Sequence, residues 1–578
     1  MTLSNPVRFE PNVDMPMRDG VVLRANLYRP EGDGPHPVLL SRTPYDKDAS
    51  TNGLVAALRY ASNGYVVLVQ DCRGRFASDG VFYPMLNELE DGYDSVEWAA
   101  KQSWSNGNVG VFGPSYLGVT TWFSAAGKPP HLKAISPAVT GCDYHDGWFY
   151  QSGAFLQGFS LSWTAANLAL GQVSRLDASN DKKREARERL MELAGSPRKA
   201  MEQLPLSAIG AFLADSGVAP YYADWLAHPA SDGYWSRWNL ATHHHNIDVP
   251  VLAIGGWYDM FLHGTLDNYT GMRKNGGSGM ARDKQRLIVG PWAHRVPLYG
   301  PNQGDVNFGP LSQGSAIDLD GIVLRWFDRW LKGEENGASE EPRVRLFTTG
   351  INQWQEFEDW PPSNLMPTKY YLHSGGTANS ASGDGLLSTD APEAEPPDVY
   401  TYDPRHPVPS LGGGITGQGG AYDQSAIEQR NDVLVYSTPP LERDLQVTGP
   451  IEVRLWASTS AVDTDFSAKL VDVSPRGFAK NLADNLVRAR YRNSLAKEEL
   501  LEPSRRYEFR IDLFGASNVF KKGHRIRVEI SSSNFTRFDR NPNTGGSLAD
   551  GTELRPALQT VHHDAGGPSH IVLPVMPA

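Results

Sequence analysis

Short apolar runs that recur at helix-length intervals are the feature that most limits how this chain can fold. They lie at residues 38–40, 65–69, 109–112 and 132–135. Strands with both faces buried are almost continuously apolar in this way, and the segments between them leave room for a helix. The runs therefore predict a mostly parallel α/β sheet. Ahead of them, residues 21–29 alternate apolar and polar side chains and predict an antiparallel hairpin.

This pattern of buried strands stops near Asp143 and resumes near residue 249. Residues 143–246 contain no strand-like run but many aromatic side chains, and the charged stretch at 181–193 predicts a helix. Buried-strand runs then return at 249–254 and 286–289. We therefore interpret residues 143–246 as a helical cap inserted into the sheet domain.

The C-terminal part of the chain has a different pattern. Residues 374–397 are polar and rich in Gly, Ser, Ala and Glu, which predicts a surface loop or linker. Beyond them, strands of period two at 451–455 and 525–530 predict an all-β sandwich or jelly roll. Because 578 residues exceed what one hydrophobic core holds, we expect several domains. They are an α/β core at 1–142 and 247–360, a helical cap at 143–246, and a β-sandwich at 361–578.

Charge and cysteine content narrow the class of protein. The formal net charge is −12, and no basic stripe is present, which argues against nucleic acid as a partner. With only two cysteines, Cys72 and Cys142, the fold cannot depend on a disulfide framework and suits a reducing compartment. The first residues lack the apolar stretch of a signal peptide, and no segment reaches the ~20 apolar residues of a membrane span. We expect a cytoplasmic enzyme with no membrane partner.

A candidate nucleophile, Ser115, stands between the apolar run at 109–112 and a helical run at 116–126. In a nucleophile elbow the serine sits on a strained strand-to-helix turn, and small residues flank it because the backbones approach closely. Gly113 lies two residues before Ser115, as that turn requires. The second glycine, Gly118, is one position later than in Gly-x-Ser-x-Gly. On the motif alone, an ordinary glycine-bearing turn is the competing interpretation.

A base and its orienting acid follow the serine in the order typical of α/β-hydrolases. Asp259 comes directly after the predicted strand that ends at Tyr258, and His294 directly after the one that ends at Ala293. Both positions lie where a sheet strand ends, which is the edge on which α/β sheets build their sites. An isolated Asp or His there is usually structural. Ser115, Asp259 and His294 in this order at three strand ends predict a catalytic triad.

Two donors for the oxyanion follow from position. One is the backbone N–H of Tyr116. The second donor usually comes from the loop after an early strand, which here spans residues 41–47 and lacks the His-Gly-Gly run of many esterases. Since a tyrosine hydroxyl can donate equally well, Tyr45 is the candidate, with a half-buried structural aromatic as the alternative.

Further motifs along the chain carry a family resemblance. They are Met17-Arg18-Asp19-Gly20, Arg42-Thr43-Pro44-Tyr45-Asp46-Lys47, Gln70-Asp71-Cys72-Arg73-Gly74, Gly113-Pro114-Ser115-Tyr116-Leu117-Gly118, Gly256-Trp257-Tyr258-Asp259, Gly290-Pro291-Trp292-Ala293-His294, Ser458-Thr459-Ser460-Ala461-Val462-Asp463-Thr464-Asp465-Phe466 and Ser531-Ser532-Ser533-Asn534-Phe535. On these motifs the chain resembles, over essentially its whole length, the cocaine esterase group within the X-Pro dipeptidyl-peptidase and α-amino-acid ester hydrolase superfamily of serine hydrolases.

The resemblance implies an α/β-hydrolase core with an inserted helical cap and a C-terminal jelly-roll domain. It also implies Ser115, Asp259 and His294 as the triad, and the Tyr45 hydroxyl and Tyr116 N–H as the oxyanion hole. The shifted second glycine fits, because the family pattern is Gly-x-Ser-Tyr-x-Gly.

By the same resemblance, Trp148, Trp163 and Phe261 line an acyl pocket between core and cap, with plain core packing as the alternative. One departure concerns the substrate. After Pro409-Ser410-Leu411-Gly412-Gly413, where the aryl-ester-cleaving relative has large apolar side chains, this chain has Gly414-Ile415-Thr416-Gly417. A more open or more polar wall is implied, which speaks against activity on cocaine itself.

Two other features carry less functional weight. Consecutive histidines cannot all face one ion, so we interpret His243-His244-His245 as a flexible, solvated connection into the strand at residue 249 and expect no metal. Arg73 and Arg75 suggest an anion site, but beside Asp71 and Asp79 we interpret them as bracing their loop through ion pairs. We expect no cofactor.

The combined prediction is a serine carboxylic-ester hydrolase that acts through an acyl-enzyme on small-molecule esters with a bulky or aromatic acyl group. The same triad serves amide chemistry, so an X-Pro dipeptidyl-peptidase or a β-lactam acylase stays open. A non-catalytic carbohydrate- or partner-binding protein is an alternative from another class. The sequence leaves open the natural substrate and whether the chain forms a homodimer.

Overall fold

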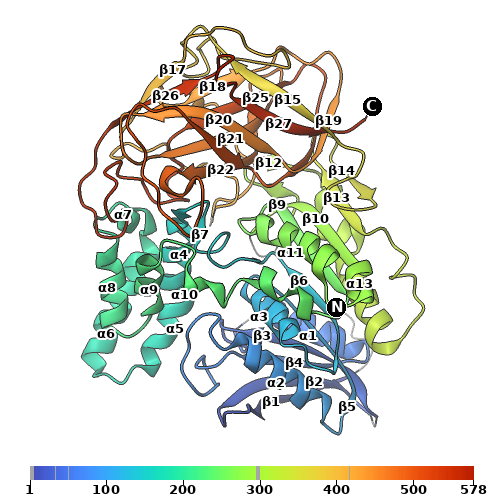
Figure 1. The fold of residues 1–578 in the computed structure, drawn as a ribbon. Helices are drawn as coiled ribbons and strands as arrows, with labels where there is room; N and C mark the ends of the chain where they lie inside the picture. Colours follow the sequence, from blue (N-terminus) through green and yellow to red (C-terminus); the bar gives the residue numbers. More distant parts are fainter. Residues whose placement is uncertain (1–5, 33, 50, 295–299, 416, 578) are drawn as a thin grey trace.

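The computed structural model describes residues 6–32, 34–49, 51–294, 300–415 and 417–577, and its α/β part is built on one large sheet (Figure 1). The strand order is β1-β2-β4-β3-β5-β6-β9-β10-β13-β14. Pairing is parallel from β4 to β13 and antiparallel at β1, β2 and β14, as the buried runs predict. The strands are β1 (Val7–Pro16), β2 (Val22–Pro30), β3 (His36–Thr43), β4 (Val66–Asp71), β5 (Ser105–Pro114), β6 (Leu132–Ala138), β9 (Val251–Tyr258), β10 (Gln285–Ala293), β13 (Val344–Thr348) and β14 (Gln353–Phe357).

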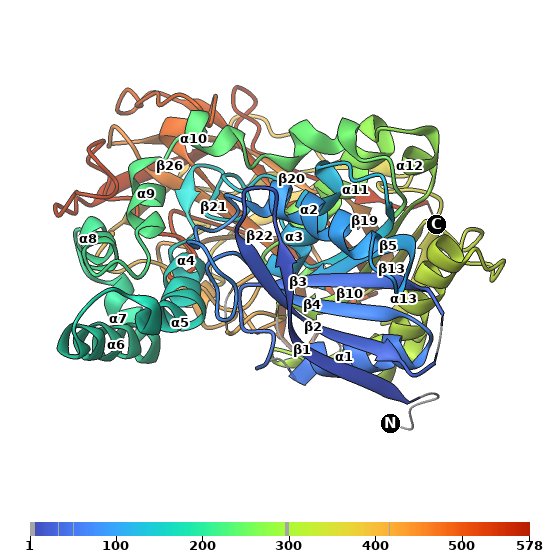
Figure 2. The same cartoon turned by 90° about the horizontal axis from the view of Figure 1, so that it is seen from below.

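Helices cover both faces of this sheet, as Figure 2 shows. Alternate residues of a strand point to opposite faces: Val38 and Leu40 pack with α2, α3 and α11, whereas Leu39 packs with α1 and α13. The helices are α1 (Thr51–Ser62), α2 (Glu88–Ala100), α3 (Tyr116–Ala126), α11 (Leu262–Asn275), α12 (Gly279–Asp283) and α13 (Leu319–Phe327). A short ribbon of β11 (Asn302–Gln303) and β12 (Val306–Asn307) follows β10. No helix in the described ranges combines the length and apolar character needed to cross a bilayer.

Between β6 and β9 the chain forms a group of helices beside the sheet (Figure 1). They are α4 (Gln157–Trp163), α5 (Leu170–Gln172), α6 (Asn180–Gly195), α7 (Pro197–Met201), α8 (Ser207–Asp215), α9 (Tyr221–Ala227) and α10 (Gly233–Ser236), with a π-helix at Thr164–Ala169 and a 3-10 helix at Leu240–Asn246. Contrary to the sequence prediction, this region contains strands, β7 (Tyr150–Gln151) and β8 (Ala154–Phe155). They were too short to show as a run. Ser152 and Gly153 join them, both at positive φ, as a tight hairpin turn requires.

The C-terminal part is β-rich and lies above the α/β sheet and the group of helices in Figure 1. Its sheet has the order β17-β26-β20-β27-β15-β16-β18-β25-β21-β22, with β19, β23 and β24 attached at the side. The strands are β15 (Met366–His373), β16 (Leu386–Ser388), β17 (Asp398–Tyr402), β18 (Leu434–Ser437), β19 (Leu445–Gly449), β20 (Glu452–Thr459), β21 (Asp465–Val473), β22 (Ala479–Arg488), β23 (Tyr507–Asp512), β24 (Ala516–Phe520), β25 (Arg525–Ser531), β26 (Ala557–His562) and β27 (His570–Val575). The prediction of a loop or linker at 374–397 is wrong in part, because β16 lies inside it and buries Leu387.

The β7–β8 hairpin is bound to the C-terminal part by polar contacts. The Asp539 carboxylate accepts a hydrogen bond from the Phe155 N–H at 2.9 Å, and the Asp539 N–H donates back to the Phe155 carbonyl at 3.0 Å. Arg537 donates to the Gln151 amide oxygen at 3.0 Å. Arg488, fully buried, then bridges Asp539 and Asp465 through four hydrogen bonds of 2.9–3.0 Å.

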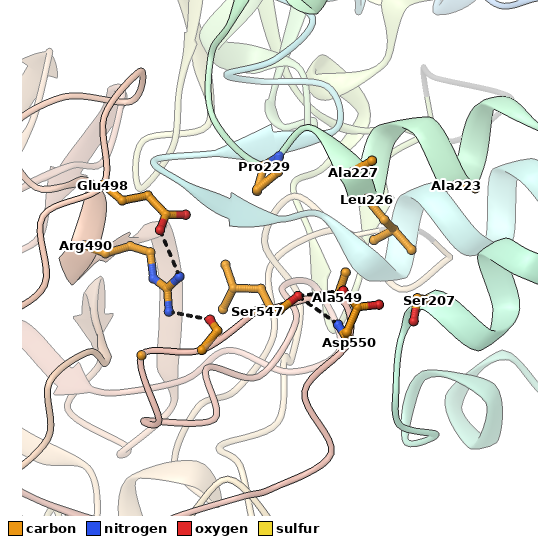
Figure 3. A pocket seen from close by; sticks show the side chains of 13 residues that line it. Ser207, Ala223, Leu226, Ala227, Pro229, Arg490, Glu498, Ser547, Ala549 and Asp550 are labelled. Carbon is orange, nitrogen blue, oxygen red and sulfur yellow. Dashed lines mark hydrogen bonds and ion pairs between the residues drawn. The ribbon is translucent and has the colours of Figure 1, made fainter.

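A cavity of about 550 Å³ with polar and apolar lining residues lies at the same boundary (Figure 3). The helices α8 and α9 form one wall, and the loop at residues 545–550 with Arg490 forms the other. Arg490 is held there by Glu498 at 3.3 Å and by the Gly546 carbonyl at 3.0 Å. The helical segment and the C-terminal part therefore meet around this cavity as well as through the hairpin.

Replacing Arg488 with methionine should lower the free energy of unfolding by about 3–5 kcal/mol, because Asp465 and Asp539 would be left as uncompensated buried carboxylates. Urea denaturation measures this. Arg405 is the matched control: it pairs with Asp403 but is 54% exposed, and Arg405→Ala should cost less than ~1 kcal/mol. Equal costs for the two variants would contradict the prediction.

Candidate active site

Ser115 occupies a sharp turn between the end of β5 and the start of α3. Its φ is 58°, a left-handed conformation that costs a non-glycine residue on the order of 1–3 kcal/mol. The Ser115 N–H donates to the Ala138 carbonyl of the neighbouring β6 at 2.9 Å, which holds the turn against the sheet. The conformation raises the Ser115 hydroxyl above the carboxyl edge of the sheet.

Steric crowding explains why glycine occupies the two positions that flank the serine. A Cβ on Gly113 would overlap the Cβ of Leu117, so no side chain fits where the strand enters the turn. A Cβ on Gly118 would lie 2.7 Å from the Cβ of Thr140, which explains a glycine three positions after the serine. Both glycines let α3 pack closely against its own strand and the end of β6.

The structure brings Ser115, Asp259 and His294 together. His294 Nε2 lies 3.0 Å from Ser115 Oγ, and His294 Nδ1 lies 2.8 Å from Asp259 Oδ1. Asp259 follows β9 and has a fully buried side chain, whereas the His294 side chain after β10 is 18% exposed. Because β9 and β10 are adjacent parallel strands, their carboxyl ends deliver the acid and the base to the same edge.

Asp259 is held by hydrogen bonds within its own loop, and a glycine of the C-terminal part packs against that loop. The Phe261 N–H donates to Asp259 Oδ1 at 3.2 Å, and the Asp259 N–H donates to the Gly256 carbonyl at 3.1 Å. Gly414 lies against this loop so closely that a Cβ on it would be 3.0 Å from Met260 Cα. The segment expected to widen the substrate wall thus reaches the loop of the acid, although Thr416 within it lies outside the described residues.

The predicted oxyanion donors flank the Ser115 hydroxyl. Tyr116 is the first residue of α3, so its N–H has no partner within the helix. The Tyr45 hydroxyl accepts the indole N–H of Trp163 at 2.9 Å, and the Ser115 side chain is near enough to act on the pKa of this hydroxyl. Burial raises the pKa of Tyr45 to about 12, so its hydroxyl keeps its proton at neutral pH and can donate it.

The three aromatic residues assigned to the acyl pocket lie in one cluster next to His294. Trp148 stacks on Phe261 with ring centroids 4.0 Å apart. The Phe261 ring is perpendicular to the His294 ring, with centroids 5.0 Å apart and an interplanar angle of 89°. The ring centroid of Trp163 lies 5.8 Å from that of Trp148 and 5.9 Å from that of Tyr116. Sequence reasoning did not assign Phe159, which stacks on Trp163 at 5.4 Å; its spacing of four residues from Trp163 on α4 is the signal that could have found it.

The interpretation of the two arginines changes with the structure. Arg73 does form ion pairs, but with Asp91 and Asp19 and not with Asp71 or Asp79. Arg75 donates to backbone carbonyls in both the Tyr45 loop and the helical segment. The ion-pair interpretation is wrong for Arg75, because its partners are distant in sequence and carry no charge.

The histidine run is also ordered differently from the prediction. His244 is 1% exposed and hydrogen-bonds to the Asn268 side chain at 3.0 Å, so a solvated connection is wrong for this residue. Its neighbours on the 3-10 helix point elsewhere, because consecutive residues of a helix do not share a face. Within the described residues, no group of three or more His, Cys, Asp or Glu side chains is arranged to hold a metal ion.

Comparison with known proteins gives two matching family models and several relatives. The model described as X-Pro dipeptidyl-peptidase (S15 family) matches residues 19–295, and the X-Pro dipeptidyl-peptidase C-terminal non-catalytic domain matches residues 336–572. The chain is 40% identical over 579 residues to the cocaine esterase of Rhodococcus sp. (strain MB1 Bresler), covering 98% of each chain.

Solved structures are similar over the whole chain. An α-amino acid ester hydrolase matches with a TM-score of 0.80 and 26% identity, covering 99% of this chain and 97% of that one. An aminopeptidase from the marine sediment archaeon Thaumarchaeota archaeon matches with a TM-score of 0.82 and 26% identity, covering 100% and 97%.

Substituting Gly113 with alanine should displace the start of α3 and with it Ser115, because the new methyl group overlaps Leu117. We expect a loss of stability of about 1–3 kcal/mol, typical of overpacking, and loss of labelling by a fluorophosphonate probe. Gly195→Ala is the matched control, since a Cβ there meets nothing within 4 Å. Full labelling of the Gly113→Ala variant would show that the turn tolerates a side chain.

Proposed function

Because the chain belongs to the family of cocaine esterase and the S15 X-Pro dipeptidyl-peptidases, we propose that it is a serine hydrolase that cleaves carboxylic esters through an acyl-enzyme on Ser115. The family membership confirms the resemblance derived from the motifs. The observation that carries the proposal is the unbroken hydrogen-bonded series from Ser115 Oγ through His294 to Asp259, at 3.0 and 2.8 Å.

The first half of the proposed reaction acylates Ser115. As Ser115 Oγ attacks the ester carbonyl carbon, its proton moves to His294 Nε2, and the Asp259 carboxylate accepts the Nδ1–H and stabilises the imidazolium. When the tetrahedral intermediate collapses, the C–O bond to the alcohol breaks and the leaving oxygen takes the proton from His294. Water then repeats the same steps on the acyl-enzyme, with His294 again as base, and releases the acid.

The negative oxygen of each tetrahedral intermediate would lie between the Tyr116 N–H and the Tyr45 hydroxyl. A well-placed donor of this kind contributes about 3–4 kcal/mol to the transition state. The Tyr45 hydroxyl is supported as a donor by its high pKa, which keeps it protonated, and by its contact with the Ser115 side chain. Tyr116 is buried and Tyr45 is partly buried, which strengthens the interaction because less water competes there than at an exposed site.

The architecture and the family support the domain organisation that we propose. Residues 1–142 and 247–360 form an α/β-hydrolase core, residues 143–246 a helical cap, and residues 361–578 a jelly roll. The parallel strands β3 to β10 with helices on both faces support the core assignment. The largely antiparallel C-terminal sheet supports the jelly roll.

We propose that the acyl group of the substrate is bulky and apolar and lies against Trp148 and Phe261. Both rings are buried, and Phe261 contacts His294, so an acyl group bound at Ser115 would meet them. The relative at 40% identity is named for cocaine, an ester substrate of that protein. With Gly414 in place of a large apolar residue, we expect this chain to accept other alcohol groups better than that of cocaine.

Amide cleavage is the second candidate. The S15 family model and the aminopeptidase structure favour it, since both names denote cleavage of peptide bonds. The same triad can cleave either bond, and the difference lies in pocket shape and in protonation of the leaving amine. A panel of p-nitrophenyl esters, aminoacyl-proline amides and β-lactam amides would separate the two by their kcat/KM values.

Ser115→Ala should reduce ester turnover by about 10⁴-fold or more, because the nucleophile is lost, while the unfolding midpoint stays near that of the parent. Fluorophosphonate labelling should also disappear. Ser124→Ala, a buried serine on the same helix whose hydroxyl binds the Thr120 carbonyl, is the control and should label normally. Turnover that survives Ser115→Ala, or a parent protein that does not label, would favour a non-catalytic binding protein instead.

Phe261→Ala should lower kcat/KM for p-nitrophenyl benzoate about tenfold more than for p-nitrophenyl acetate. The reason is that only the aromatic acyl group packs against the ring that the substitution removes. The backbone N–H that binds Asp259 is kept in this variant, so the triad stays oriented. Steady-state kinetics with the two esters measures the ratio. An equal loss for both substrates would place Phe261 outside the acyl site.

A further inference from the structure

The hydrogen bond between Trp163 and Tyr45 can have only one direction. An indole N–H donates and never accepts, so Trp163 Nε1 occupies a lone pair of the Tyr45 oxygen at 2.9 Å. The single hydrogen of the Tyr45 hydroxyl therefore cannot point back at Trp163 and is free to turn toward Ser115, the other side chain that interacts with this hydroxyl. Donation into the oxygen also polarises the O–H group and makes it a stronger donor.

Arg75 ties the backbone beside Tyr45 to the backbone beside Trp163. Its Nε donates to the Pro44 carbonyl at 2.7 Å, immediately before Tyr45. Its Nη1 and Nη2 donate to the carbonyls of Leu168 and Asn167 at 2.9 and 3.3 Å. These carbonyls belong to the π-helix Thr164–Ala169, which continues directly from Trp163. The planar, forked guanidinium thus fixes both partners of the Trp163–Tyr45 bond.

The position of Arg75 is costly for a purely structural residue. The residue is 1% exposed, and within the described residues its hydrogen bonds go to carbonyls and not to a carboxylate. An isolated buried charge is strongly unfavourable. Here the rings of Phe76 and Phe82, each 4.9 Å from the guanidinium carbon, and the three carbonyl dipoles offset that cost.

We propose that Trp163 and Arg75 are positioning residues that hold the Tyr45 hydroxyl with its hydrogen directed at the oxyanion of the substrate. The inference rests on the proposed function of Tyr45. It assigns Trp163 a role beyond lining the acyl pocket: the segment that covers the substrate also completes the oxyanion hole. Catalysis then depends on the placement of the π-helix, since a shift of that helix would turn the Tyr45 hydroxyl away.

The first test is Trp163→Phe, which removes the N–H and keeps an aromatic ring. We expect kcat on p-nitrophenyl acetate to fall about tenfold, the value of one hydrogen bond, with KM changed less than kcat. Trp235→Phe is the matched control, because it also removes a buried indole N–H of the same helical segment, bound at 2.8 Å to the His228 carbonyl. The control should keep the kcat of the parent.

The Tyr45→Phe background separates positioning from packing. Tyr45→Phe alone should lower kcat about 100-fold, as loss of an oxyanion donor does. Adding Trp163→Phe should then change kcat less than about twofold, because the N–H acts only through the missing hydroxyl. Equal factors in both backgrounds would overturn the positioning role while the proposed function stands. An unchanged kcat in Tyr45→Phe would refute both the oxyanion assignment and this inference, leaving the Ser115 test to judge the esterase itself.

Arg75 is tested by truncation and chemical rescue. Arg75→Ala should lower kcat about tenfold or more. Guanidinium at roughly 10–50 mM, far below denaturing concentrations, should restore part of the lost kcat by occupying the vacated site. If that variant does not fold, Arg75→Lys keeps the charge but not the three-way fork and should show the same loss. An Arg75→Lys variant with the kcat of the parent would show that only the charge matters and overturn the proposal for Arg75.

Discussion

The left-handed backbone at Ser115 is the constraint on which the chemistry of this molecule depends. Its φ of 58° is unfavourable for any residue with a side chain, and it persists because β5, β6 and α3 surround it with buried contacts. The glycines at 113 and 118 are needed only because this turn brings α3 so close to the sheet. With Ser115 fixed, the neighbouring parallel strands β9 and β10 need only end at the same edge for Asp259 and His294 to meet it.

Much of the fold could be predicted from the sequence, because its signals are local. Strands with both faces buried are apolar throughout, so β3 to β6 and β9 to β10 appear as runs, and the helix predicted at 116–126 is α3. The features that were missed depend on distant partners. β7 and β8 are two residues each and exist as strands only through the turn at Ser152 and Gly153. β16 lies in a polar stretch and is a strand because β15 and β18 flank it.

The candidate site shows the same division. The positions of Ser115, Asp259 and His294 follow from where strands end, which a sequence displays directly. The contacts of the residues around the site could not be predicted in this way, because they depend on partners distant in sequence. The sequence predicts ion pairs for Arg75 because carboxylates are near it in sequence, whereas its partners are carbonyls 31 to 93 positions away. Burial of His244 likewise depends on Asn268, on a helix that the histidine run itself does not reveal.

The hairpin formed by β7 and β8 has a consequence for how such enzymes diversify. It belongs to the helical segment between β6 and β9, yet Asp539 and Arg537 of the β-rich part hold Phe155 and Gln151. This segment is therefore bound on two sides, through Arg75 to the loop that follows β3 and through the hairpin to the β-rich part. Exchanging the helical segment alone between relatives would break the contacts between this hairpin and the β-rich part. Recombination between relatives would therefore keep both sets of contacts only if the helical segment and the β-rich part were exchanged together.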